Sequence, residues 1–161
     1  MRNGSLRDHI HGCRNLPLLR WERRYDIVAG VASALHYIHN EYDQVVVHRD
    51  LTSSNVMLDA AFKARLGDFG LARALNSGET SFTDVDPVGT WGYIDGECCA
   101  SANFTYESDV YAFGVLVLEV VCGRPPLHKG ASGFHVLVDW VSNLHGEGRL
   151  LKAVNQRLGG E

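Results

Sequence analysis

Three polar side chains near the middle of the chain have the types and spacing that phosphate chemistry requires. Asp50 and Asn55 lie five residues apart within the stretch Val45–Leu58, and Asp68 follows ten residues after Leu58. Short apolar runs flank these loops, so a pair of short strands could bring the three side chains to one point. One carboxylate would accept a proton from an attacking hydroxyl group, and the other two side chains would hold magnesium beside a phosphate. The sequence therefore predicts a magnesium–phosphate site.

The elements that must position this site begin with a long predicted helix. Apolar residues recur at three- and four-residue spacing from about residue 18 to residue 39, which predicts an amphipathic helix with one buried stripe. The predicted stripe consists of Trp21, Tyr25, Val28, Ala32, Leu35 and Ile38. The predicted solvent side carries Arg20, Glu22, Arg23, Arg24 and Asp26, and we interpret His36 and His39 as surface or stripe-edge residues. Before it, Ser5 is predicted to cap a short helix through Ile10, and residues 12–17 are predicted to form a loop.

Three short strands are predicted to carry the loops of the site, at residues 45–48, 56–58 and 64–66. The thirty residues from Asp68 to Glu97 show no sustained periodicity. A loop of that length in a compact domain is usually functional or mobile. The hydroxyl residues along it are Thr80, Ser81, Thr83 and Thr90.

A second long helix is predicted from about Asp109 to Val121, with Thr105 or Ser108 as its N-cap and Gly123 at its end. Its residues are apolar on nearly every face, so we expect it to be the central helix of the core. A loop at residues 129–133, an amphipathic helix from residue 137 to about residue 146 and a short helix at residues 150–154 complete the chain. The predicted fold class is mainly α with a small β-hairpin region (α+β).

Composition narrows the classes of function. The 161 residues suffice for one domain, and a net charge of −4 gives no electrostatic reason to expect nucleic acid or an anionic membrane as a partner. Four cysteines without C-x-x-C spacing favour free thiols in a reducing compartment over a zinc site. The N-terminus lacks the apolar region of a signal peptide, and the longest apolar run, Val110–Cys122, is too short to span a bilayer. We therefore expect the chain as given to be soluble and cytoplasmic.

The motifs and their order resemble the eukaryotic protein kinases, and among these the plant receptor-like kinases with a legume-lectin domain. His48–Leu58 has the H-R-D-L-x-x-x-N pattern of the catalytic loop, and Asp68–Gly70 is the D-F-G motif. Further stretches that carry the resemblance are residues 30–39, 64–73, 89–93, 107–114 and 122–126. The resemblance implies that residues 1–161 form a partial kinase domain. This part is the C-lobe, from just after the hinge to about the helix G region, without the N-lobe and the last C-lobe helices.

Roles for individual residues follow from this resemblance. Asp50 would orient and deprotonate the substrate hydroxyl, Arg49 would pair with a phosphorylated loop hydroxyl, and His48 would be structural. The implied ATP- and magnesium-binding residues are Asn55 and Asp68 as metal ligands, with Phe69 buried beside the loop and Gly70 as a hinge. The implied structural and substrate-turn residues are Thr90, Glu97 and Asp109, and the phosphorylation candidates are Thr80, Ser81 and Thr83. Taken singly, each Asp is more often a turn or cap residue; the joint spacing favours the site.

The sequence also departs from the family pattern. These residues contain neither the glycine-rich phosphate loop nor the Val-Ala-Ile-Lys lysine, and Asp95-Gly96-Glu97 replaces Ala-Pro-Glu. Thr52 stands where Ser/Thr kinases carry a lysine, and Ser54 is also uncharged. Because phosphoryl transfer relies on cations, these losses should lower the rate by roughly a thousandfold or more. We expect a gene model truncated at Met1, or a truncated duplicate.

The sequence thus predicts a fragment of a kinase that uses ATP and magnesium to phosphorylate Ser or Thr of proteins in receptor-like kinase signalling. We expect the isolated chain to be inactive. One alternative is a non-catalytic, pseudokinase-like module that binds substrates or partner kinases through the long loop and the helix around Trp140. Another is a product that does not fold stably. The family implies the cytosolic side of a plasma membrane; the sequence predicts no oligomeric state.

Overall fold

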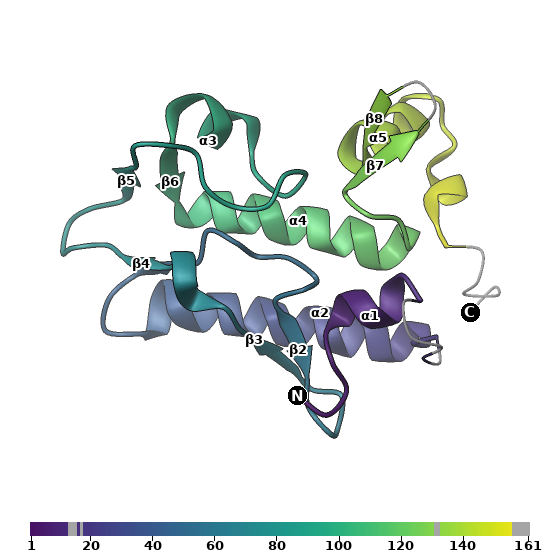
Figure 1. The fold of residues 1–161 in the computed structure, drawn as a ribbon, viewed down its shortest axis with the longest axis horizontal. Helices are drawn as coiled ribbons and strands as arrows, with labels where there is room; N and C mark the ends of the chain where they lie inside the picture. The colour runs from purple at the N-terminus through teal and green to yellow at the C-terminus, as the bar shows by residue number, and fades with distance from the viewer. Residues whose placement is uncertain (13–15, 17, 131–132, 156–161) are drawn as a thin grey trace.

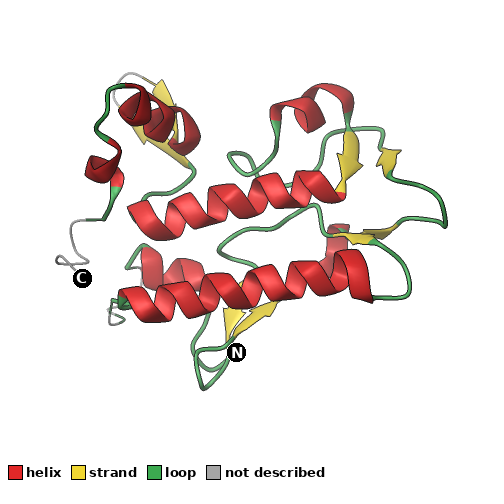
Figure 2. Ribbon diagram, turned by 180° about the vertical axis from the view of Figure 1, so that it is seen from behind, coloured by secondary structure: helices red, strands yellow, loops and turns green. Residues whose placement is uncertain are grey.

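Two long helices that lie side by side organise the structure. The computed structural model describes residues 1–12, 16, 18–130 and 133–155. Helix α2 (Trp21–His36) packs along α4 (Tyr106–Cys122), and the small sheets and short helices surround this pair (Figure 1). The view from behind shows the same side-by-side arrangement, with α2 in front (Figure 2). The predicted class, mainly α with a small β region, is confirmed.

Helix α1 (Leu6–Ile10) begins at the predicted N-cap. The hydroxyl of Ser5 accepts a hydrogen bond from the backbone N–H of Asp8, whose carboxylate in turn accepts one from the backbone N–H of Ser5. This reciprocal capping box satisfies two donors at the start of the helix. The chain before it pairs with the end of β2 (Val56–Leu58), where the N–H of Leu58 donates to the carbonyl of Gly4 at 2.9 Å.

Helix α2 is present as predicted, but half of its predicted buried stripe is exposed, and Arg24, predicted on the solvent side, is buried. Its fully buried side chains are Arg24, Ile27, Val31 and Leu35, whereas Trp21, Tyr25 and Ala32 are exposed. Arg24 can be buried because its guanidinium donates to the carbonyl of Leu19 at 2.9 Å and to that of Val120. These two bonds offset part of the cost of burying the charge, while the Nη2 atom of Arg24 is buried without a hydrogen-bond partner among the described residues. A single turn of π-helix, η1 (Tyr37–Glu41), ends the helix.

The strands are short and pair in four two-stranded antiparallel sheets within the described residues. The three predicted strands are found as β1 (Val46–Val47), β2 and β3 (Ala64–Leu66), and β2 pairs with β3. The long loop was predicted without strands, but it contains the 3-10 turn η2 (Phe69–Leu71), β4 (Arg73–Ala74) and β5 (Ser81–Thr83). Strand β4 pairs with β1, and β5 pairs with β6 (Asn103–Thr105).

Helix α4 begins three residues earlier than predicted and follows the short helix α3 (Gly96–Ser101), which was not predicted. Thr105 is its N-cap, in a capping box with Ser108, and the chain leaves it at Gly123 with φ 65°. Its buried apolar residues join those of α1, α2 and β2 in one core, as expected of a central helix. The helix is apolar on most of its surface, but burial does not follow residue type throughout. Two of its fully buried residues are Asp109 and Glu119, and two apolar ones, Val110 and Tyr111, are exposed.

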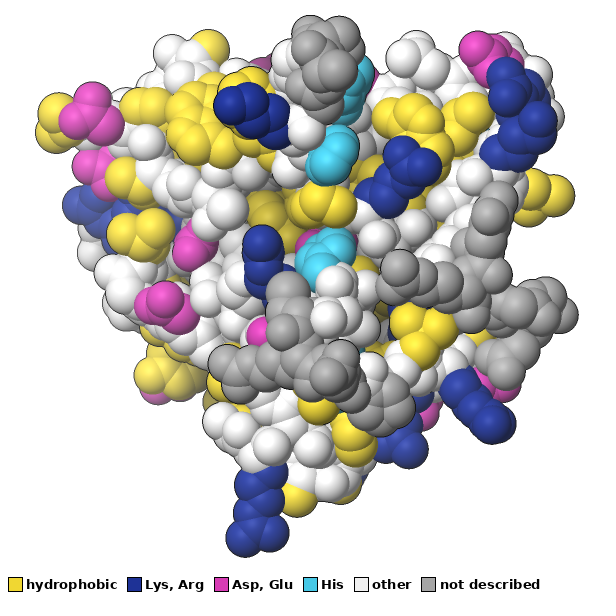
Figure 3. All heavy atoms as spheres, turned by 45° about the vertical axis from the view of Figure 1, so that its right-hand side comes forward, with side chains coloured by type: hydrophobic (Ala, Val, Ile, Leu, Met, Phe, Trp, Pro, Cys, Tyr) yellow, Lys and Arg dark blue, Asp and Glu magenta, His cyan; other side chains and the backbone are white. Residues whose placement is uncertain are grey.

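The C-terminal part forms a hairpin and a helix beside α4. Strands β7 (Leu127–Gly130) and β8 (Gly133–Val136) replace the loop predicted at residues 129–133, of which residues 131–132 lie outside the described ones. Helix α5 (Leu137–Gly146) is present as predicted, and the last turn, η3 (Leu150–Ala153), is a 3-10 helix. On this side of the molecule hydrophobic side chains are interspersed with Lys, Arg and His (Figure 3).

Two further expectations concern the loop predicted at residues 12–17 and the absence of a membrane-spanning segment. The loop predicted at residues 12–17 falls largely on residues 13–15 and 17, outside the described part of the chain, as does Cys13. Within the described ranges, none of the helices has both the length and the apolar character needed to cross a bilayer.

Candidate active site

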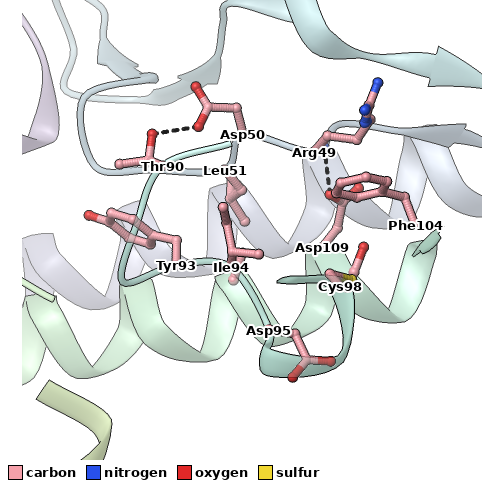
Figure 4. Close-up of a pocket in the computed structure, with 12 residues that line it drawn as sticks. Arg49, Asp50, Leu51, Thr90, Tyr93, Ile94, Asp95, Cys98, Phe104 and Asp109 are labelled. Carbon is pink, nitrogen blue, oxygen red and sulfur yellow. Dashed lines mark hydrogen bonds between the residues drawn. The ribbon is translucent and has the colours of Figure 1, made fainter. Parts of the chain in front are cut away.

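The loop between β1 and β2 is held by one buried carboxylate. Asp109, in the first turn of α4, accepts the backbone N–H of His48 at 2.7 Å and that of Arg49 at 2.8 Å. Arg49 has a left-handed backbone, with φ 71°. A non-glycine residue persists in this region only where its surroundings enforce it. Asp109 therefore fixes the turn that presents Asp50, and Figure 4 shows the bond to Arg49.

The same carboxylate binds a histidine from the turn after α2. The Nε2 atom of His39 lies 2.9 Å from an Oδ atom of Asp109, and His39 is only 8% exposed. The interpretation of His39 as a surface or stripe-edge residue was therefore wrong, whereas His36 is exposed as expected. The π-turn moves His39 inward, and no sequence pattern signalled that turn.

The carboxylate of Asp50 is oriented by two side chains. Asn55 donates from its amide nitrogen to the backbone carbonyl of Asp50 at 2.8 Å and to its carboxylate at 2.9 Å. The hydroxyl of Thr90 donates to the other carboxylate oxygen at 2.6 Å, and the two side chains face each other in Figure 4. The structure thus joins the predicted loop residues to the predicted turn residue, forty positions away.

Asp68 lies next to this loop because β2 and β3 pair. The N–H of Gly67 donates to the carbonyl of Asn55 at 2.9 Å, which places the following residue, Asp68, beside Asn55. Asp68 is exposed, and its backbone has the left-handed conformation, with φ 57°. Among the described residues, its carboxylate accepts only the N–H of Gly70, at 3.3 Å. Its carboxylate is therefore free to bind a further ligand.

The residues around this turn are only partly as expected. His48 is fully buried, with Nε2 3.1 Å from the carbonyl oxygen of Gly67 and its ring edge-on to Phe69 at 4.8 Å between centroids. Phe69 was expected to be buried and is instead 46% exposed. Its ring packs against His48 while much of its surface remains accessible to solvent, so that expectation was wrong.

Thr52, the residue in the lysine position, is turned into the loop. It is 4% exposed, and its hydroxyl accepts the backbone N–H of Asn55 at 3.3 Å. Ser54 is exposed but uncharged. Within the loop, neither of these positions therefore offers a cation to a phosphate.

Glu119 forms a buried network beneath the site that the sequence analysis missed. Its carboxylate accepts the hydroxyl of Ser53 at 2.8 Å and the hydroxyl of Tyr93, and it lies 2.7 Å from Nε2 of His11. Burial, followed by the charge of Glu119, raises the pKa of Tyr93 well above its ordinary value. An acidic residue inside an otherwise apolar helix was the signal that could have predicted this network.

Arg49 has a carboxylate partner that the sequence analysis also missed. Its guanidinium donates to the carboxylate of Asp84 at 2.6 Å and to the carbonyl of Leu71 at 3.1 Å. The phosphorylation candidates lie just before Asp84. Thr80 and Thr83 are exposed, and Ser81 is half-buried.

The turn before Thr90 approaches the loop closely. Gly89 has φ 120°, and a Cβ atom there would lie 2.7 Å from the carbonyl oxygen of Arg49, so only glycine fits. Glu97 is exposed in the first turn of α3.

The site combines a buried acid that holds the loop, an oriented aspartate in that loop and a second aspartate on the adjoining hairpin. Together these features indicate a protein kinase. The protein kinase domain family matches residues 1–145, and the chain belongs to the protein kinases. It is 46% identical over 159 residues to the L-type lectin-domain containing receptor kinase VI.2 of Arabidopsis thaliana. It is 49% identical over 162 residues to the L-type lectin-domain containing receptor kinase S.7 of Oryza sativa subsp. japonica.

These matches cover 98% and 99% of this chain but only 23% and 22% of the two relatives. The chain therefore spans about a quarter of the length of the curated relatives. The resemblance to plant lectin receptor kinases is confirmed.

Proposed function

We propose that this chain supplies the catalytic-loop half of a site that transfers phosphate from ATP to Ser or Thr of proteins. The observation that carries this proposal is the bond of 2.6 Å from the hydroxyl of Thr90 to the carboxylate of Asp50. A threonine hydroxyl already donates to this oriented carboxylate at the protein surface. A substrate hydroxyl that replaces it would meet the same acceptor.

Asp50 would then act as the acceptor of a proton. The substrate oxygen forms a bond to the γ-phosphorus of ATP, the bond from that phosphorus to the β–γ bridging oxygen breaks, and ADP leaves. The proton of the substrate hydroxyl passes to the carboxylate of Asp50. Asn55 keeps this carboxylate in place through its bonds of 2.8 and 2.9 Å to the carbonyl and the carboxylate of Asp50.

The side chains beside Asp50 suit magnesium. The amide nitrogen of Asn55 donates to Asp50, which leaves its amide oxygen to bind a metal ion. The exposed carboxylate of Asp68 can also bind a metal ion, because it accepts only the N–H of Gly70 among the described residues. Both are hard oxygen donors of the kind that magnesium prefers. Among the described residues, there is no group of three or more His, Cys, Asp or Glu side chains that could hold a metal ion. Phosphate oxygens and water would therefore complete the coordination of magnesium. Magnesium would supply positive charge to the phosphates.

We further propose that the 161-residue chain does not catalyse this reaction by itself. Its sequence contains no glycine-rich loop and no Val-Ala-Ile-Lys lysine, and Thr52 lies buried where a lysine would approach the phosphate. Without these cations the charge that develops on the phosphate oxygens is poorly stabilised.

The relatives are named receptor kinases with a lectin domain. We propose that the domain to which this chain contributes works in receptor signalling on the cytosolic side of a plasma membrane.

The second candidate is a non-catalytic module that binds partner kinases or substrate proteins. The specific observation in its favour is the engagement of Thr52, whose hydroxyl is bonded within its own loop. With threonine at position 52, the loop keeps the shape of a substrate site but lacks the positive charge that a lysine would supply.

One assay separates the candidates. Transfer of radiolabelled phosphate from ATP to a generic protein substrate is measured with magnesium, for the 161-residue chain and for any longer product of the same gene. Asp50→Asn is the matched variant, because it keeps the size of the side chain and removes the base. Transfer by the longer product that disappears in the variant supports the kinase, and transfer that survives in the variant rejects the role of Asp50. No transfer by either product, together with binding of a substrate protein, supports the module.

A further inference from the structure

The guanidinium of Arg49 lies in an enclosed site formed by segments far apart in the chain. The Arg49 side chain is only 6% exposed. Its guanidinium carbon lies 4.9 Å from the ring centroid of Phe82 on β5 and 4.3 Å from that of Phe104 on β6. Burial of a cation is unfavourable unless an anion accompanies it.

The anion is the carboxylate of Asp84. One carboxylate oxygen of Asp84 accepts a hydrogen bond of 2.6 Å from the guanidinium of Arg49. The other oxygen accepts the backbone N–H of Val85 at 2.9 Å. The Val85 N–H and then the Arg49 guanidinium hold the pKa of Asp84 below its ordinary value, so the carboxylate is ionised at neutral pH. The guanidinium of Arg73 lies over the same Phe82 ring, at 4.7 Å from its centroid, and adds positive charge near Asp84.

The ion pair closes a structured segment. The backbone N–H of Asp84 donates to the carbonyl of Ala102 at 2.9 Å, directly after the pairing of β5 with β6. The Phe82 and Phe104 rings stack at 5.7 Å between centroids beneath the guanidinium. Asp84 thus ties this part of the long loop to the turn that carries Asp50.

We propose that Asp84 is a built-in counter-ion for Arg49, which orders residues 81–85 without phosphorylation of the loop. The proposal concerns the order of the loop and does not depend on phosphate transfer by the chain, so its test is independent of the proposed function.

A phosphate on the neighbouring hydroxyls would meet an occupied site. Thr83 and Ser81 lie on β5, within three residues of Asp84. A phosphate there would add negative charge beside the Asp84 carboxylate and would compete with it for one guanidinium. Phosphorylation of Thr80, Ser81 or Thr83 is therefore expected to leave the order of the segment unchanged or to lower it.

The test is hydrogen exchange, followed by mass spectrometry, of phosphatase-treated protein. In the wild type we expect the amides of residues 81–85 to be protected without any phosphate. Asp84→Ala should lower this protection about tenfold or more, since hydrogen bonds between charged groups are the strong ones. Asp84→Asn, which keeps an acceptor but removes the charge, should give a smaller loss. The matched control is Asp86→Ala, an exposed acid two residues later, which should exchange like the wild type.

Three outcomes would overturn the proposal. These are unprotected amides in the unphosphorylated wild type, equal protection in Asp84→Ala and Asp86→Ala, or a gain in protection on phosphorylation of Thr80, Ser81 or Thr83. If Asp84→Ala also loses protection in α4, the Asp84→Asn variant decides. A loss confined to residues 81–85 supports the counter-ion, and an unchanged exchange rate rejects it.

Discussion

His39 and Asp109, seventy residues apart in the chain, meet in the interior with 2.9 Å between Nε2 and Oδ2. The contact joins the turn after α2 to the first turn of α4. The same carboxylate holds two successive N–H groups of the loop that presents Asp50. The two long helices and the candidate active site therefore share one buried acid.

Asp109→Asn should destabilise the protein by about 2–4 kcal/mol, because an amide replaces one of the two acceptor oxygens with a donor. A backbone N–H of the loop or the ring of His39 then loses its partner. The free energy of unfolding from urea titration measures the effect.

Asp139→Asn is the control for this substitution. Asp139 also lies in the first turn of a helix, α5, but it is exposed. Its replacement should not change the unfolding midpoint measurably. Equal midpoints for the two variants would contradict the role of Asp109.

Tyr93→Phe should cost about 1.5–3 kcal/mol, because it removes one donor from the buried carboxylate of Glu119. The N–H of Ser53, which donates to the Tyr93 oxygen at 3.3 Å, also loses its acceptor. The same urea titration applies. Tyr25→Phe, at a residue that is 63% exposed, should be neutral, and a loss of the same size there would refute the explanation.

Two glycine substitutions should have opposite signs. Gly89→Ala places a methyl group 2.7 Å from the carbonyl oxygen of Arg49 at φ 120°, which should destabilise the protein by about 2 kcal/mol or more. Gly114→Ala lies within α4 with open space around its Cβ position. It should stabilise the protein by roughly 0.5–1 kcal/mol, because alanine has the higher helix propensity. Thermal melts of both variants test the pair, and the same sign for both would count against it.

The buried thiols should react slowly with iodoacetamide. Burial raises the pKa of Cys98 and of Cys122, which lowers the fraction of reactive thiolate at neutral pH. Raising the pH increases that fraction, so their rates should still rise at a pH where an ordinary cysteine is fully ionised. Mass spectrometry of peptides between pH 7 and pH 10 measures each site.

Cys99, which is partly exposed, serves as the internal comparison and should be modified first in the folded protein. In urea the three thiols should react at similar rates. A rate for Cys98 or Cys122 equal to that of Cys99 in the folded protein would show that burial does not protect them.

Local patterns in the sequence were sufficient for the elements that have strong local signals. Ser5 and Thr105 cap their helices through contacts three residues away, and Gly123 ends α4 with a backbone that glycine adopts easily. Strands β4 and β5 are no shorter than β1 and β2, but they were missed because they contain no apolar run and lie in a segment without sustained periodicity.

The sequence by itself determined the family, the class of fold and the identity of the residues that gather around Asp50. Their types and spacing are local properties of the chain, and so are the caps and the long periodic helices. Only the tertiary structure decided which charged groups are buried and what they bind. Arg24, His39, Glu119 and Asp84 acquire their roles from partners that lie far away in the sequence or in another element. Burial of a charge is tolerable only where the fold supplies those partners, and no local pattern records where they come from.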